Sequence, residues 1–107
     1  MRLSALQKYI LLQSIQSRKA LYARDDLHGF YRAMDRAPKN EDQQNSITKS
    51  LERLIDKGLI IGYGRRTPEK WFIDSIKLTP RGRRTAKTLL GEQQHLPLRL
   101  RPLTKKP

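Results

Sequence analysis

The chain has 107 residues, which is enough for one hydrophobic core but too few for two. It contains no cysteine, which excludes disulfide bonds and thiolate metal sites, and it holds no stretch approaching the roughly 18 apolar residues of a membrane-spanning helix. With 23 lysines and arginines against 10 aspartates and glutamates, the formal net charge is +13. Because like charges repel one another in the folded chain, this excess favours an anionic partner.

The positive charge is concentrated in the second part of the chain. Residues 1–60 carry 11 basic and 7 acidic side chains, a net of +4, whereas residues 61–107 carry 12 basic and 3 acidic, a net of +9. A phosphate backbone neutralises such an excess and releases condensed counterions. Nucleic acid is therefore the expected partner, and the alternatives are a solubilising surface, an anionic membrane or an acidic protein.

The first predicted helix begins near Ser4, because Ser4 and Gln7 have the spacing of a capping box. Apolar residues at helical spacing carry this helix to about Ser17. Residues 19–23 are short and mildly apolar, so they predict a short strand or an extended link.

A second helix is expected to begin at Arg24 or Asp25. Its apolar stripe would consist of Leu27, Phe30, Tyr31 and Met34. Residues 35–42 include Pro38 and almost nothing apolar, so a loop is expected there.

The third helix has the clearest pattern in the chain. Its apolar stripe consists of Ile47, Leu51, Leu54 and Ile55. Gly58 follows at the position typical of a glycine that ends a helix. We expect this helix over residues 43–57, with Asn45 or Ser46 as its N-cap.

Beyond Gly58 the period changes from that of a helix to that of a strand. Two β-rich runs around a short turn predict a hairpin over residues 59–78. Thr79 and Pro80 then predict the start of a fourth helix, which would end near Leu90 and be closed by Gly91. We expect one domain over residues 1–91 and a flexible basic tail over residues 92–107, which contain three prolines.

The predicted order is helix, strand, helix, helix, strand, strand, helix, in a mainly α protein with a small β-hairpin. The run NSITKSLERLIDKGLIIGYG, followed by KLTPRGRRTAKTLL, resembles the recognition helix, wing and following helix of MarR-type and PadR-type transcriptional regulators. The resemblance covers residues 45–90. It implies a winged helix-turn-helix and sequence-specific binding of duplex DNA, as in a small transcriptional regulator or accessory factor.

The resemblance also implies which side chains meet DNA. Asn45, Ser46, Thr48 and Lys49 would lie at the end of the helix entering the major groove, Arg53 would reach a phosphate, and Arg65 and Arg66 would sit at the wing tip. The hydrogen-bonding preferences of these side chains agree, since asparagine can bond to the edge of adenine and lysine to that of guanine. Three further arginines cluster on the fourth helix. The full expected set is Asn45, Ser46, Thr48, Lys49, Arg53, Arg65, Arg66, Arg81, Arg83 and Arg84.

Two observations keep alternatives open. Acidic residues lie on or just before the third helix, which suits a winged-helix module that binds RNA or a protein within a larger assembly. The acidic residues are Glu41, Asp42, Glu52 and Asp56. The aromatic residues of the hairpin could stack on unpaired bases, although a core position is favoured for them. They are Tyr63, Trp71 and Phe72.

Catalytic patterns are weak. His28 and His95 are far apart in the sequence, which gives neither a chelating pair nor a nucleophile with its base. We therefore expect a binding protein and not an enzyme, with no cofactor or metal. We expect it in the cytoplasm, on the nucleoid if the source is bacterial or archaeal, with no membrane role. A homodimer and a place in a larger assembly both remain open.

Overall fold

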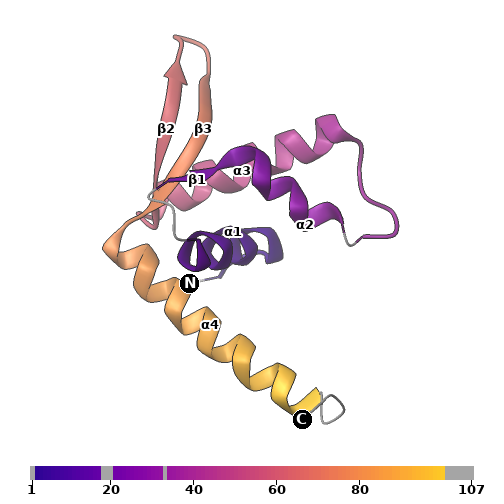
Figure 1. The fold of residues 1–107 in the computed structure, drawn as a ribbon. Helices are drawn as coiled ribbons and strands as arrows, with labels where there is room; N and C mark the ends of the chain where they lie inside the picture. The colour runs from indigo at the N-terminus through magenta and orange to yellow at the C-terminus, as the bar shows by residue number, and fades with distance from the viewer. Residues whose placement is uncertain (1, 18–20, 33, 101–107) are drawn as a thin grey trace.

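The computed structural model describes residues 2–17, 21–32 and 34–100, with side chains as far as residue 92. The elements are α1 (Ala5–Gln16), β1 (Tyr22–Ala23), the 3-10 helix η1 (Arg24–His28), α2 (Gly29–Arg32), α3 (Asn40–Asp56), β2 (Ile60–Arg66), β3 (Trp71–Leu78) and α4 (Pro80–Leu100). The predicted order of helices and strands is confirmed. In Figure 1 the β2–β3 hairpin projects beyond the helices, while α4 leaves on the other side.

The three strands form one antiparallel sheet in the order β1-β3-β2. Ile60 pairs with Leu78 at the base of the hairpin, and Arg66 pairs with Trp71 at its far end. The register shifts between Tyr63, which pairs with Ser75, and Gly64, which pairs with Ile73, so that Asp74 is an extra residue in β3. The hairpin is therefore long and carries a β-bulge near its middle.

The core lies where α1, α3 and the base of the sheet meet. Because α1, α3 and β3 present apolar residues at the period of their own secondary structure, each buries one side. The side chains with the least exposure, at 2% or below, are Ile10, Leu11, Leu27, Ile47, Leu51, Leu54, Leu59, Ile60, Ile73, Ile76 and Ala86. This core holds the base of the hairpin firmly and leaves the far half of the hairpin outside it.

The capping box predicted at the start of α1 is confirmed. The Gln7 backbone N–H donates to Ser4 Oγ at 3.1 Å, and the Ser4 backbone N–H donates to Gln7 Oε1 at 3.0 Å. The short strand expected in residues 19–23 is present as β1, although residues 18–20 lie outside the described part of the chain.

The predicted second helix differs from the structure. It consists of the 3-10 helix η1 followed by the single turn α2, with Leu27 and Tyr31 buried as expected. Met34 is 43% exposed and does not join the apolar stripe. Gly29 lies at the junction, where an added Cβ would stand 2.7 Å from Tyr9 Oη, so a larger residue there would displace the end of the Tyr9 side chain.

The start of α3 also differs. The helix begins at Asn40 and not at residue 43, and its N-cap residue, Lys39, makes no side-chain capping bond. Asn45 and Ser46 therefore lie inside the helix, and the capping role expected for them is wrong. At the other end the prediction is confirmed, because Gly58 follows the helix with a φ of 75°. The Leu59 N–H donates to the Leu54 carbonyl at 3.0 Å, which completes a Schellman motif.

Thr79 begins α4 as predicted, since its hydroxyl accepts the Gly82 N–H at 2.9 Å and Pro80 is the first helical residue. The end predicted at Gly91 is wrong, because the helix continues to Leu100. The division into a domain over residues 1–91 and a flexible tail over residues 92–107 stays a prediction, and residues 101–107 lie outside the described part of the chain.

Candidate nucleic-acid interface

The exposed side of α3 carries most of the residues expected to read DNA. Ile47, Leu51 and Leu54 are fully buried, which turns the opposite side of the helix to solvent. Asn45, Ser46, Lys49 and Arg53 are exposed there. The structure therefore leaves one complete polar helix face available to a ligand.

The same face carries acidic side chains. Glu41 and Asp42 occupy the first turn of α3, and Glu52 and Asp56 are exposed further along it. Because α3 begins at Asn40, its free backbone N–H groups belong to residues near these two first-turn carboxylates. The carboxylates of Glu41 and Asp42 therefore balance the positive end of the helix dipole. Asn45 and Ser46 lie further along the helix and are not presented to a phosphate by its N-terminus.

Thr48 is half-buried, and its hydroxyl accepts a hydrogen bond from Arg24. The Arg24 guanidinium also donates to the backbone carbonyl of Gln44 at 3.0 Å, to Gln44 Oε1 at 3.1 Å and to the Ile73 carbonyl at 3.4 Å. Burial lowers the pKa of Arg24, and the nearby carboxylate of Asp25 acts in the opposite direction. Arg24 thus fixes α3 against η1 and β3, a role that the sequence pattern did not indicate.

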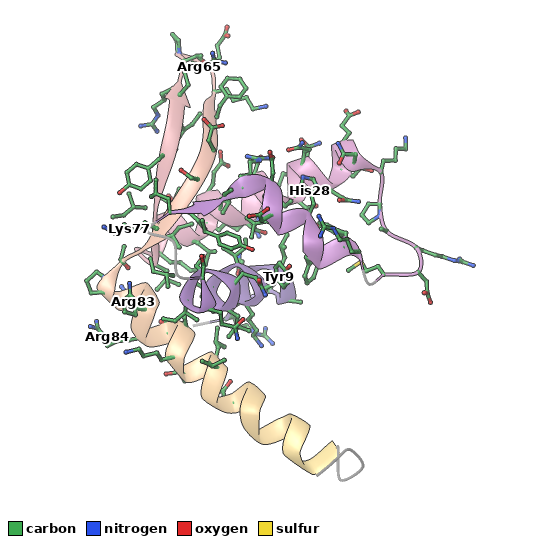
Figure 2. All side chains as sticks on the ribbon, in the orientation of Figure 1. Tyr9, His28, Arg65, Lys77, Arg83 and Arg84 are labelled. Carbon is green, nitrogen blue, oxygen red and sulfur yellow. The ribbon has the colours of Figure 1, made fainter. Side chains whose placement is uncertain are left out.

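The arginines expected at the wing tip lie just short of it. Arg65 and Arg66 are the last residues of β2, where they pair with Phe72 and Trp71, and the turn itself comprises residues 67–70. The Thr67 N–H donates to the Lys70 carbonyl at 2.8 Å and closes that turn. Arg65 and Arg66 therefore lie at the end of β2 and not in the turn itself, and both are exposed. Figure 2 shows Arg65 near the far end of the hairpin.

These two arginines lie on opposite faces of the hairpin, because successive residues of a strand alternate. The Arg66 guanidinium carbon stands 4.5 Å from the centroid of the Trp71 ring, on the face toward α3. Arg65 stands 5.3 Å from the centroid of Phe72, on the outward face. Phe72 and Tyr63 are 39% and 40% exposed, so the core position favoured for them is wrong, whereas Trp71 packs against the core as expected.

Two grooves separate α3 from the hairpin. The first lies between Asn45 and Thr48 of α3, Arg24 of η1 and residues 70–74. The second lies between Glu52 and Asp56 of α3 and the far end of the hairpin, where Arg66 contributes. Asn45 therefore shares a groove with the hairpin, whereas Arg66 faces a groove that three carboxylates line, those of Glu52, Asp56 and Glu69.

Arg81, Arg83 and Arg84 are exposed in the first turns of α4. In Figure 2, Arg83 and Arg84 lie beyond the base of the hairpin, at the opposite end from Arg65. The structure thus brings the α3 residues near the hairpin but places the α4 arginines apart from them. The ten expected residues therefore do not form one continuous surface on the molecule.

Features that would indicate other chemistry are weak in the described residues. Within the described ranges there is no group of three or more histidine, cysteine, aspartate or glutamate side chains suited to a metal ion. Among the helices so described, none combines the length and hydropathy that crossing a bilayer requires. His28 Nδ1 lies 2.8 Å from Gln43 Oε1, so this imidazole links η1 to the start of α3.

Comparison with known proteins supports the fold. A scan of protein-family models finds no match to this chain, and a search of curated proteins finds none either. Solved structures do match it. The transcriptional regulator BldR from Sulfolobus solfataricus matches with a TM-score of 0.65 and 21% identity, over 98% of this chain and 66% of that one.

Two further structures agree. The adhesin competence repressor from Streptococcus pyogenes matches with a TM-score of 0.62 and 16% identity, over 89% of this chain and 60% of that one. A possible HxlR family transcriptional factor from Thermoplasma volcanium matches with a TM-score of 0.60 and 16% identity, over 89% of this chain and 73% of that one. This chain thus spans 60 to 73% of the length of these three neighbours.

At these identities the likeness establishes the fold. The chain is a winged helix-turn-helix, with α3 at the position of the recognition helix and the β2–β3 hairpin at that of the wing. The resemblance to MarR-type regulators expected from the sequence is confirmed at this level.

Proposed function

We propose that this protein binds duplex DNA in the manner of a small transcriptional regulator or an accessory DNA-binding factor, with α3 in the major groove and the β2–β3 hairpin as wing. The observation that carries the proposal is the exposed polar face of α3 beside a projecting hairpin whose far end is basic. A net charge of +13 supplies the attraction to phosphates that such docking requires. No catalytic step is part of the proposal.

The available side chains divide into base readers and phosphate contacts. Asn45 lies where it could pair with adenine, and Lys49, one helical turn further on, could reach guanine. Arg53 would contact a phosphate, and Arg65 would contact the backbone or a narrow minor groove. Thr48 has a lesser part in this proposal than the sequence suggested, because its hydroxyl is held by Arg24.

The structural neighbours support the same role. The three proteins compared above are a transcriptional regulator, a repressor and a possible transcriptional factor. In that role the protein would act in the cytoplasm, in association with DNA. Pairing of two copies would raise specificity by reading two half-sites, and association with a larger assembly would serve the same purpose.

A second candidate function rests on the acidic side chains of α3. Four exposed carboxylates on or near the proposed reading face oppose close approach to phosphates, and they favour a partner with basic groups. In this alternative α3 contacts a protein, and the basic surface elsewhere contacts structured RNA.

The test begins with selection from random duplex DNA, followed by fluorescence anisotropy on any enriched site. We expect a defined site and loss of about 1–3 kcal/mol of binding free energy for Asn45→Ala or Lys49→Ala. Arg53→Ala should weaken all sequences alike and reduce the slope of log K against log salt by about 1. Lys8→Ala, an exposed cation on α1, is the matched control and should change little.

The outcome that contradicts the proposal is equal binding of duplex DNA and duplex RNA at moderate salt, with neither Asn45→Ala nor Lys49→Ala altering the affinity. That result would favour the RNA and protein-interaction alternative.

A further inference from the structure

The hairpin has an outward face of which the proposed duplex-binding role uses a single residue, Arg65. Because β2 alternates, its residues 61, 63 and 65 point away from α3, and their partners on β3 point the same way. The six outward positions are Ile61, Tyr63, Arg65, Phe72, Ser75 and Lys77. The opposite face is the one that meets the core, where Ile60, Ile73 and Ile76 are buried.

This outward face carries a cluster of exposed apolar side chains. Five large apolar side chains are exposed in the described part of the chain, and three of them lie here: Ile61 at 44%, Tyr63 at 40% and Phe72 at 39%. Two of these are aromatic rings, Tyr63 on β2 and Phe72 on β3. Exposed rings clustered on one surface indicate a partner, since scattered single residues would need no explanation.

The charge on this face has one sign. Of the six outward positions, two are cations and none is a carboxylate. Lys70, in the turn, adds a third cation, whose Nζ lies 5.2 Å from the centroid of the Phe72 ring. The nearest acidic residues of the hairpin are Glu69 and Asp74, which line the grooves beside α3. Lys70 lines both of these grooves as well, and Phe72 lines the one that contains Asp74. The outward face therefore suits an anion better than the acidic face of α3 does.

Exposed rings combined with cations are the chemistry that recognises unpaired nucleotides. Bases stack on aromatic rings, and neighbouring cations contact the phosphates. Arg65 and Phe72 are direct cross-strand partners, and Tyr63 lies two residues from Arg65, about 7 Å along the strand. A base that stacks on Phe72 would displace the exposed cation–ring contacts, which are individually weaker than base stacking, and would leave Arg65 and Lys70 free for phosphates.

We propose that the outward face of the β2–β3 hairpin is a second nucleic-acid surface, which binds single-stranded nucleic acid by stacking bases on Phe72 and Tyr63. Arg65, Lys70 and Lys77 contact the phosphates. In this proposal the bound nucleic acid would continue toward α4. Lys77 and the α4 arginines Arg83 and Arg84 follow one another on the same side of the view in Figure 2. This surface adjoins the groove that Asn45 and Thr48 of α3 line, because Phe72 also lines that groove. The proposal stands whether or not α3 reads duplex DNA.

The first experiment uses the unmodified protein. Fluorescence anisotropy compares oligothymidylate of about 12 nucleotides with an abasic oligomer of the same length and charge. We expect the base-bearing strand to bind at least about fivefold more tightly, since stacking on one ring is worth that factor or more. Equal affinity for the two oligomers would overturn the proposal, because it would leave only charge attraction. A uridine RNA oligomer in parallel shows whether DNA or RNA is the preferred strand.

The second experiment uses one variant that keeps the charge of the surface and one that lowers it. Phe72→Leu keeps the charge and the apolar character but removes one of the two rings, so we expect it to weaken single-strand binding about fivefold or more and to reduce the preference for the base-bearing strand. Lys77→Gln should lower the salt slope for single strands. Met34→Ala removes an equally exposed apolar side chain far from the hairpin and should change nothing.

The same variants separate the two surfaces. Asn45→Ala and Lys49→Ala should leave single-strand affinity unchanged, whatever they do to duplex binding. Loss of single-strand binding in Asn45→Ala or Lys49→Ala, or an equal loss of duplex and single-strand binding in Phe72→Leu, would show one shared surface and overturn the proposal.

Discussion

At the scale of single residues, Arg24 sets the geometry of the site without being one of the residues expected to touch DNA. Its guanidinium joins three elements, because it donates to Gln44 and Thr48 of α3 and to the Ile73 carbonyl of β3. The planar fork of arginine suits several acceptors at once. The packing of α3 against β3 therefore depends on this half-buried side chain in addition to the buried core.

Replacing Arg24 should destabilise the fold measurably. Arg24→Ala leaves partly buried acceptors unpaired, and we expect the free energy of unfolding to fall by about 1–3 kcal/mol. Arg24→Lys should recover little, because one ammonium on a flexible stem cannot reach the same acceptors. Urea denaturation followed by circular dichroism gives the comparison. Arg32→Ala, at an exposed position of α2, is the control, and unchanged stability in both Arg24 variants would refute the assigned role.

At the scale of elements, the parts of the fold that bury apolar stripes could be predicted, and the polar parts could not. The core stripe of α3 and the glycine that ends it were visible, because apolar periodicity and a positive φ leave marks in the sequence. The first turns of α3 carry no apolar residue before Ile47, so periodicity could not place the start at Asn40. This error moved Asn45 and Ser46 to the wrong position in the helix.

The candidate site shows the same division. The exposed side chains of α3 follow from its buried stripe, so Lys49 and Arg53 were placed correctly on the solvent side. The contact between Arg24 and Thr48 joins residues that are far apart in the sequence, and no local pattern indicates it. The separation of the α4 arginines from the end of the hairpin depends on how whole elements pack, which residue spacing does not specify.

Two glycines in α4 make opposite predictions. A Cβ at Gly82 would stand 1.8 Å from the Leu59 carbonyl oxygen, so Gly82→Ala should destabilise the protein by about 1–3 kcal/mol through overpacking. A Cβ at Gly91 would meet no other described atom within 4 Å, and Gly91 lies inside the helix. Gly91→Ala should therefore stabilise the protein by up to about 1 kcal/mol. Thermal unfolding of the two variants tests both. Destabilisation by Gly91→Ala would mean that α4 ends there, as the sequence pattern had predicted.

At the scale of the whole molecule, the distribution of charge matters more than its sum. The acidic side chains gather on α3 and in the grooves beside it, whereas the outward face of the hairpin and the first turns of α4 are basic. A net charge of +13 on a chain of 107 residues repels itself in the compact state. Binding a polyanion relieves that repulsion, so folding and binding are coupled through charge.

This coupling predicts that salt stabilises the free protein. Raising the ionic strength from about 0.01 M to about 0.15 M shortens the Debye length from about 30 Å to about 8 Å and screens the repulsion. We expect the free energy of unfolding to rise by about 1 kcal/mol, and a change of that size raises Tm by roughly 4–8 °C for a domain of this length. Scanning calorimetry of the free protein measures the shift. A Tm that stays constant or falls would show that local pairing already balances the charge.

The bulge at Asp74 reverses which side chains of β3 face outward beyond it. Side chains alternate along a strand with a period of two, so one inserted residue exchanges inside and outside for everything beyond it. Continued without interruption from Ile76 and Leu78, the same alternation would have turned Phe72 toward α3 and Trp71 toward water. Which aromatic ring this hairpin offers to solution is therefore decided by a count of residues, at a point where the chemistry of the inserted side chain is of secondary importance.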